Sequence, residues 1–128
     1  RQPATVDSVN QRVHFLKMEG KEVYKNAVTA MTAAAREVMD RAGLSMGDIK
    51  CVIPHQANQR IIDAVGQRLG VDPDKVFVNL HKYGNTSAAS VAVALREAVD
   101  AGCIERGDLV LMIAFGAGLT WGATVLEW

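Results

Sequence analysis

The chain has 128 residues, which suits one compact domain, and 49% of them are hydrophobic, enough to form a sizeable core. Fourteen Lys and Arg residues balance fourteen Asp and Glu residues, and this formal net charge of zero argues against a general nucleic-acid binder. No apolar run reaches the ~18–20 residues of a membrane helix, and no charged segment precedes an apolar stretch at the start, so neither a membrane partner nor a signal peptide is expected.

The first predicted elements lie between Val13 and Pro54. Val13–Met18 is short and mixed and reads as an edge strand. Apolar residues then recur with a 3.6-residue period over Lys21–Ala42, which predicts an amphipathic helix that Gly43 caps. Ser45–Asp48 has the pattern of a short capped turn, and Lys50–Pro54 predicts a short buried strand.

The middle of the chain predicts two further helices around another strand. Ala57–Leu69 carries apolar residues on one face and predicts a helix, and Pro73 suits the first position of a turn. Val76–Leu80 is expected to be a strand and His81–Asn85 a loop. Thr86–Ala101 predicts a third helix whose small side chains favour close packing.

The end of the chain predicts a strand pair. Leu109–Phe115 is almost continuously apolar, as in a strand buried on both faces, and Leu119–Trp128 predicts a last strand after the turn at 116–118. The order β-α-β-α-β-α-β-β implies an α/β fold with parallel strands and helices on both faces of the sheet. The last two strands should pair antiparallel, which makes the sheet mixed.

Polar residues follow three of the predicted strands, at the edge where open α/β sheets bind ligands. His55 follows the first buried strand, Asn85 follows Val76–Leu80, and a Gly-rich turn at 116–118 follows the next strand. Each has an ordinary structural explanation as well: Asn85, for example, precedes a helix as an N-cap would. The same edge therefore predicts either a catalytic group or a set of caps and turns.

The cysteines and histidines leave few other options. Cys51 and Cys103 are too few for a disulfide framework, and no metal-ligand spacing is present, so we expect no metal site and a cytoplasmic location. Cys51 reads as a small buried hydrophobe. A nucleophile pair of Cys51 and His55 is the alternative, and it requires an exposed cysteine of low pKa.

Three strings resemble the C-terminal half of the β-ketoacyl-acyl-carrier-protein synthase III family, a branch of the thiolase superfamily. They are Pro54-His55-Gln56-Ala57-Asn58-Gln59-Arg60, Gly84-Asn85-Thr86-Ser87-Ala88-Ala89-Ser90 and Ala114-Phe115-Gly116-Ala117-Gly118-Leu119-Thr120-Trp121-Gly122. The resemblance runs from about Met18 to Trp128. It implies that residues 1–128 form a thiolase-like half, normally one of two similar halves in a five-layered αβαβα core.

The resemblance also implies roles for individual residues. His55 and Asn85 would be the catalytic histidine and asparagine, while the nucleophilic cysteine belongs to the other half and is absent here. The backbone N–H of Ala117, where the family often has glycine, would supply half of an oxyanion site. Asn58 and Phe115 would contact the pantetheine arm and the acyl chain. Arg60 would help to dock the carrier protein.

The implied reaction is a decarboxylative condensation of acyl-CoA with malonyl-acyl-carrier protein, which begins fatty acid synthesis and needs no cofactor. The expected partners are acyl carrier protein, the other half of the enzyme and, at full length, a second copy in a homodimer. A polyketide starter enzyme and an inactive assembly module are the alternatives. Alone, the chain should expose an apolar patch and tend to self-associate.

Overall fold

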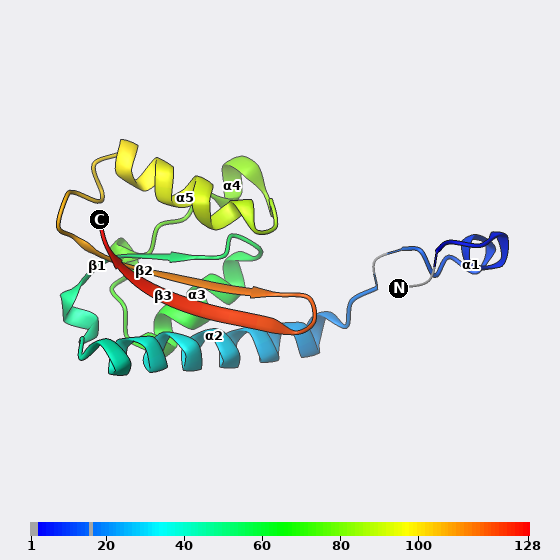
Figure 1. Ribbon diagram of the computed structural model, residues 1–128, viewed down its shortest axis with the longest axis horizontal. Helices are drawn as coiled ribbons and strands as arrows, with labels where there is room; N and C mark the ends of the chain where they lie inside the picture. The colour runs from blue at the N-terminus through cyan, green and yellow to red at the C-terminus, as the bar shows by residue number, and fades with distance from the viewer. Residues whose placement is uncertain (1–2, 16) are drawn as a thin grey trace.

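The computed structural model describes residues 3–15 and 17–128, and its body is a three-stranded sheet between two layers of helices (Figure 1). β1 (Ile49–Pro54) runs parallel to β2 (Leu109–Gly116), and β2 pairs antiparallel with β3 (Thr120–Glu127), in the order β1-β2-β3. The mixed α/β sheet predicted from the sequence is therefore confirmed.

The helices divide between the two faces of this sheet. α2 (Gly20–Ala42) and α3 (Gln59–Leu69) cover one face, and α4 (Leu80–Tyr83) and α5 (Ala89–Asp100) lie over the other (Figure 1). Two short 3-10 turns, η1 (Met46–Asp48) and η2 (Pro73–Lys75), occur where the capped turn and the proline predicted them.

The larger core cluster lies under α2 and α3, where the 3.6-residue period of α2 points its apolar side chains at the sheet. Its buried members come from α2, α3, the Val71 loop, β1 and β2: Ala27, Val28, Met31, Ala35, Met39, Ile49, Val52, Val65, Val71, Leu111 and Ile113. α2 ends where Gly43 adopts φ +65°, a conformation that glycine reaches without strain, so the chain turns back into β1.

The second cluster lies between the sheet and α5. Ala94 and Ala98 are fully buried, and because they are small the helix packs closely against Cys51, Ile53 and Val110. This confirms the close packing that the small residues of the third helix predicted. Successive strand residues point to opposite faces, so β1 and β2 contribute side chains to both clusters.

The predicted strand at Val76–Leu80 is wrong. Only Val76 forms a bridge, a parallel one to Val52, and the N–H of Phe77 donates to the carbonyl of Val52 over 3.0 Å. Beyond that point the backbone groups bond to the side chain of Gln56 instead of continuing a ladder with β1. The chain then enters α4, a short helix at 80–83 within the predicted loop.

The predicted edge strand at Val13–Met18 is also wrong for the residues described there, which form turns and irregular chain; residue 16 lies outside the described part. A short helix, α1 (Val6–Asn10), precedes them, and this segment extends away from the α/β body (Figure 1). Among the residues that the structure describes, none of the helices combines the length and apolarity needed to cross a bilayer.

Candidate active site

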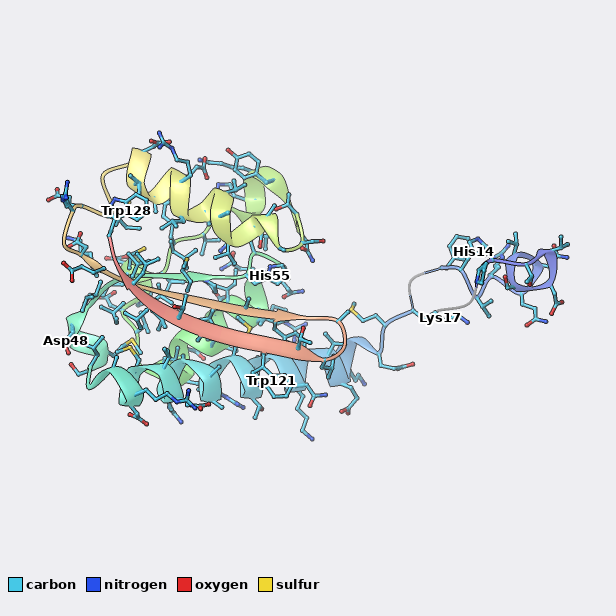
Figure 2. The ribbon with its side chains drawn as sticks, viewed as in Figure 1. His14, Lys17, Asp48, His55, Trp121 and Trp128 are labelled. Carbon is cyan, nitrogen blue, oxygen red and sulfur yellow. The ribbon has the colours of Figure 1, made fainter. Side chains whose placement is uncertain are left out.

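The carboxyl ends of β1 and β2 lie at one edge of the sheet, and His55 stands there directly after β1 (Figure 2). Its backbone N–H donates to the carbonyl of Ile113 in β2 over 2.7 Å. This bond extends the pairing of the two strands by one residue, so the position of the imidazole is tied to the sheet. The turn that joins β2 to β3 starts at the same edge.

The imidazole of His55 is held by α5. Its Nδ1 lies 2.6 Å from the hydroxyl oxygen of Ser90, in the first turn of that helix, and the same oxygen accepts the backbone N–H of Gln56 at 3.2 Å. His55 is half-buried, and this desolvation lowers the pKa of its imidazole. The ring is therefore neutral near pH 7 and has one N–H to donate.

Gln56 fastens the end of β1 to the segment that leads to α4. The side chain is 1% exposed, and its Nε2 donates to the carbonyls of Pro54 and Phe77 at 2.7 and 3.2 Å. Its Oε1 accepts the backbone N–H groups of Asn79 and Leu80 at 3.0 and 3.2 Å. One side-chain amide thus satisfies four backbone groups, and its bonds replace the strand pairing that was predicted for Val76–Leu80.

Asn85 lies in the loop between α4 and α5. Its Oδ1 accepts the backbone N–H of Ser87 at 2.9 Å, whereas the N-cap position of α5 is occupied by Ala88, so the N-cap explanation of Asn85 is wrong. The Nδ2 group of Asn85 makes no hydrogen bond within residues 3–15 and 17–128. The exposed amide N–H₂ is therefore available to a ligand. No hydrogen bond joins it to His55 in the described part of the chain.

The carboxylate of Glu97 in α5 holds α4 against α5. It accepts hydrogen bonds from Asn79 Nδ2 at 2.7 Å, Lys82 Nζ at 2.9 Å and the Tyr83 hydroxyl at 3.0 Å. The bond from Asn79, followed by those from the other two donors, lowers the pKa of Glu97. These three hydrogen bonds fix the start of the Asn85 loop, because Gly84 directly follows α4.

Ala117 lies in the turn between β2 and β3, and it is exposed. Its carbonyl accepts the Thr120 hydroxyl at 3.3 Å, while its backbone N–H makes no hydrogen bond to any residue that the structure describes. That N–H is free to bind an anion, as the predicted oxyanion role requires.

Asn58 and Arg60 stand at the start of α3. Asn58 is the N-cap, and its Oδ1 accepts the backbone N–H of Arg60 at 2.9 Å. The exposed guanidinium of Arg60 lies over the ring of Tyr24 in α2, with its carbon 5.5 Å from the ring centre. This contact orients a positive charge at the surface. Their predicted roles in binding pantetheine and carrier protein stay predictions.

Phe115 lies on the other face of the sheet from the contact between His55 and Ser90. It is partly buried and packs against the cluster under α2 and α3, with Ile113 among its neighbours on that face. The structure therefore does not bring Phe115 and the His55 ring together on one face. Its predicted contact with an acyl chain stays a prediction.

The alternative nucleophile pair of Cys51 and His55 is not supported. Cys51 is 3% exposed in the cluster under α5, and burial, with a smaller contribution from Cys103, raises the pKa of its thiol to about 11. A thiol of this kind is protonated and shielded, the reverse of what a nucleophile needs. Cys51 is a buried hydrophobe, as the sequence indicated. Cys103 is exposed.

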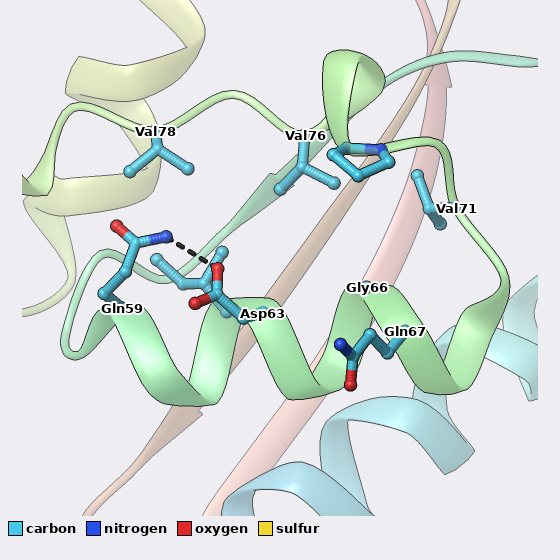
Figure 3. A pocket seen from close by; sticks show the side chains of 9 residues that line it. Gln59, Asp63, Gly66, Gln67, Val71, Val76 and Val78 are labelled. Atoms are coloured by element: carbon cyan, nitrogen blue, oxygen red, sulfur yellow. Dashed lines mark hydrogen bonds between the residues drawn. The ribbon is translucent and has the colours of Figure 1, made fainter.

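A groove of about 390 Å³ lies elsewhere, between α3 and the segment 71–78 (Figure 3). Val71, Val76 and Val78 of that segment line it opposite α3, and Gln59 in α3 donates to Asp63 over 2.8 Å. None of the predicted site residues lines it.

Ser90 and Gln56 are the two polar contributors that the sequence interpretation left without a role. Both stand inside the quoted strings, but a serine in a helix of small residues and a glutamine after a histidine carry no distinctive chemical pattern. Their function depends on contacts that span 35 and 23 positions of the chain, which only the fold reveals.

Comparison with known proteins gives one consistent answer. The family model described as "3-Oxoacyl-[acyl-carrier-protein (ACP)] synthase III C terminal" matches residues 39–128. A curated relative, β-ketoacyl-acyl-carrier-protein synthase III of Caldanaerobacter subterraneus, is 54% identical over all 128 residues. The chain spans 39% of the length of that relative.

Solved structures agree with this result. The 3-oxoacyl-acyl-carrier-protein synthase III of Aquifex aeolicus superposes with a TM-score of 0.88 at 51% identity, over 89% of this chain and 37% of that one. A priming β-ketosynthase from a polyketide biosynthetic pathway has a TM-score of 0.82 at 43% identity, over 94% and 38% of the two chains. The α/β fold described above is therefore the fold of the C-terminal part of these enzymes.

Proposed function

Because the chain belongs to the 3-oxoacyl-acyl-carrier-protein synthase III family, we propose that it is the C-terminal half of a condensing enzyme that joins acyl-CoA to malonyl-acyl-carrier protein. The observation that carries the proposal is the half-buried imidazole of His55, whose pKa is lowered by burial. It is held between the sheet and α5, at the edge that also carries Asn85 and the Ala117 turn.

The nucleophile comes from outside these 128 residues in this proposal. Cys51 is buried and its thiol pKa is raised, so it is unsuited to acyl transfer. A cysteine thiolate in the remaining part of the enzyme attacks the acyl-CoA carbonyl, and CoA leaves as a thiolate that takes up a proton. The acyl group is then a thioester on that cysteine.

His55 and Asn85 act in the second stage. The bond between the malonyl α-carbon and its carboxylate breaks, carbon dioxide leaves, and the electron pair forms an enolate whose negative charge develops on the thioester oxygen. The imidazole N–H and the amide N–H₂ are neutral donors that stabilise this oxygen. The enolate carbon then attacks the acyl thioester, a carbon–carbon bond forms, and the cysteine thiolate leaves.

The proposal also gives roles to a second oxyanion donor and to residues that bind the substrates and the carrier protein. The backbone N–H of Ala117, which has no partner among the described residues, donates to the tetrahedral oxyanion of each acyl transfer, as backbone donors do in other acyl-transfer sites. Arg60 presents a fixed positive charge that attracts the acidic carrier protein, and Asn58 and Phe115 contact pantetheine and acyl chain. No cofactor beyond the two substrates takes part.

The proposal extends to assembly. The exposed apolar side chains include Val13, Phe15, Met18, Leu119 and Trp121. We propose that the other half of the enzyme and the second copy of a homodimer cover these side chains, and that the enzyme is cytoplasmic. A priming role in polyketide synthesis is the second candidate, favoured by the TM-score of 0.82 with a priming β-ketosynthase. The two differ in the starter acyl group.

The test compares the chain alone with a fusion in which it replaces the C-terminal part of the Caldanaerobacter relative. Release of CoA from acetyl-CoA is measured with malonyl-acyl-carrier protein, and longer or branched acyl-CoA substrates then separate the two candidates. We expect the chain alone to be inactive and the fusion to be active.

His55→Ala and Asn85→Ala should each lower kcat of the fusion by about 10²–10³-fold, because each removes one donor to the developing charge. His81→Ala and Asn26→Ala are matched controls on exposed positions and should leave kcat unchanged. Turnover by the chain alone, or full activity of the His55 variant, contradicts the proposal.

A further inference from the structure

Ser90 has a buried hydroxyl with two polar neighbours and no partner in its own helix. It is 2% exposed, and its oxygen lies 2.6 Å from Nδ1 of His55 and 3.2 Å from the backbone nitrogen of Gln56. The only other buried hydroxyl in a described helix, that of Thr32, donates to the carbonyl of Val28 four residues earlier. Ser90 makes no such bond in the part of the chain described.

The hydrogen-bonding capacity of a hydroxyl decides between two arrangements. A serine oxygen has one hydrogen to donate and two lone pairs, and the contact with Gln56 uses a lone pair because the backbone N–H is the donor. If Nδ1 of His55 carries the proton, the second lone pair is used and the serine hydrogen has no acceptor among the described residues. If Nδ1 is unprotonated, it accepts that hydrogen and every group is satisfied.

We propose that Ser90 is a positioning residue that fixes the tautomer of His55: its hydroxyl donates to Nδ1, so the ring carries its proton on Nε2. A buried hydroxyl without an acceptor is unfavourable, which disfavours the other tautomer by roughly ten- to a hundredfold. Nε2–H is then the only donor that the ring presents. The role in catalysis rests on the proposed function, whereas the tautomer itself does not.

This assignment explains how α5 serves the site without contributing a catalytic group. Asn85 leads into α5 and Ser90 lies in its first turn, so one helix start places the amide of Asn85 and sets the donor of His55. The Gln56 N–H completes the arrangement because it occupies one lone pair of the Ser90 oxygen, so a protonated Nδ1 would take the other and leave the serine hydrogen without an acceptor. Two adjacent residues and a serine 35 positions later thereby specify a single proton position.

The experiment reads the tautomer directly. The chain is labelled with ¹⁵N-histidine and carries His14→Gln and His81→Gln at two exposed positions, so His55 is the one ring observed. Long-range ¹H–¹⁵N spectra at about pH 8, where imidazoles are neutral, distinguish a protonated from an unprotonated ring nitrogen. We expect one form with the proton on Nε2, and a mixture of tautomers in Ser90→Ala.

The control is Thr32→Val, which removes a buried hydroxyl in α2 far from the site and should leave the His55 spectrum unchanged. A parent spectrum with the proton on Nδ1 overturns the proposal, whether or not Ser90→Ala folds. An unchanged spectrum in a folded Ser90→Ala also overturns it. In the active fusion, Ser90→Ala should lower kcat about tenfold with little change in KM, which separates loss of the tautomer from loss of the proposed function.

Discussion

Replacing Gln56 with leucine tests how much of the fold depends on one buried amide. The two side chains are similar in size, so the substitution removes hydrogen bonds without opening a large cavity. It leaves the carbonyls of Pro54 and Phe77 and the N–H groups of Asn79 and Leu80 without their partners. All four lie in the stretch from the last residue of β1 to the first residue of α4.

The expected loss follows from counting these groups. A buried backbone group without a partner costs about 1–3 kcal/mol, and water can reach some of the four because this segment is half-buried. We therefore expect Gln56→Leu to lower the free energy of unfolding by about 3–5 kcal/mol, a large part of the ~5–15 kcal/mol of a typical domain.

The assay is equilibrium unfolding of the chain in urea, followed by far-UV circular dichroism. The control is Gln67→Leu, an exposed glutamine on α3, which should stay within about 0.5 kcal/mol of the parent. The urea dependence of the free energy should be the same in all three proteins. A loss below about 1 kcal/mol for Gln56→Leu would refute the reasoning, since it would mean that water or a shifted backbone replaces the amide.

Three further outcomes follow from the site and its surroundings. A small alkylating reagent should label Cys103 at least about tenfold faster than Cys51, whose thiol is buried and has a pKa of about 11; equal rates would restore Cys51 as a candidate nucleophile. The folded pKa of Glu97 is lowered, so its contribution to stability is complete above the unfolded-state pKa and is lost as pH falls through the folded value. Glu97→Gln should therefore make Tm decrease less steeply as pH falls below about 5. An unchanged dependence of Tm on pH would contradict the stabilising role of the hydrogen bonds to Glu97. Gly84→Ala should cost about 1–3 kcal/mol in urea unfolding because φ +67° and ψ −162° suit only glycine, whereas Gly47→Ala, at an ordinary backbone conformation, should be close to neutral.

Much of the fold follows from local patterns in the sequence. The 3.6-residue period predicts α2 and α3 to within two residues of their observed starts, and Gly43 and Gly70 end them in the left-handed conformation. The apolar run before Gly116 predicts β2 because buried strands have no polar face. In each case the prediction needs only a pattern of neighbouring residues and no contact between distant parts of the chain.

The failures have a different physical origin. Val76–Leu80 has the composition of a strand, yet the carbonyl of Phe77 and the N–H groups of Asn79 and Leu80 bond to one side chain more than twenty residues earlier, that of Gln56. Asn85 looks like an N-cap, but Ser87 takes its Oδ1 at the bend before α5. The sequence also suggests where His55 lies without showing that Ser90 contacts it, because that contact joins a strand end to a distant helix.

The parallel pairing of β1 with β2 has a consequence for the order in which the site forms. Three residues connect β2 to β3, whereas roughly fifty separate β1 from β2, and closing the longer loop costs about 2–3 kcal/mol more in chain entropy. We therefore expect the β2–β3 hairpin to form early and locally, and β1 to join it later. The bond from the His55 N–H to Ile113 bridges that junction, and the contact with Ser90 joins the end of β1 to α5, so we expect the candidate active site to assemble late in folding.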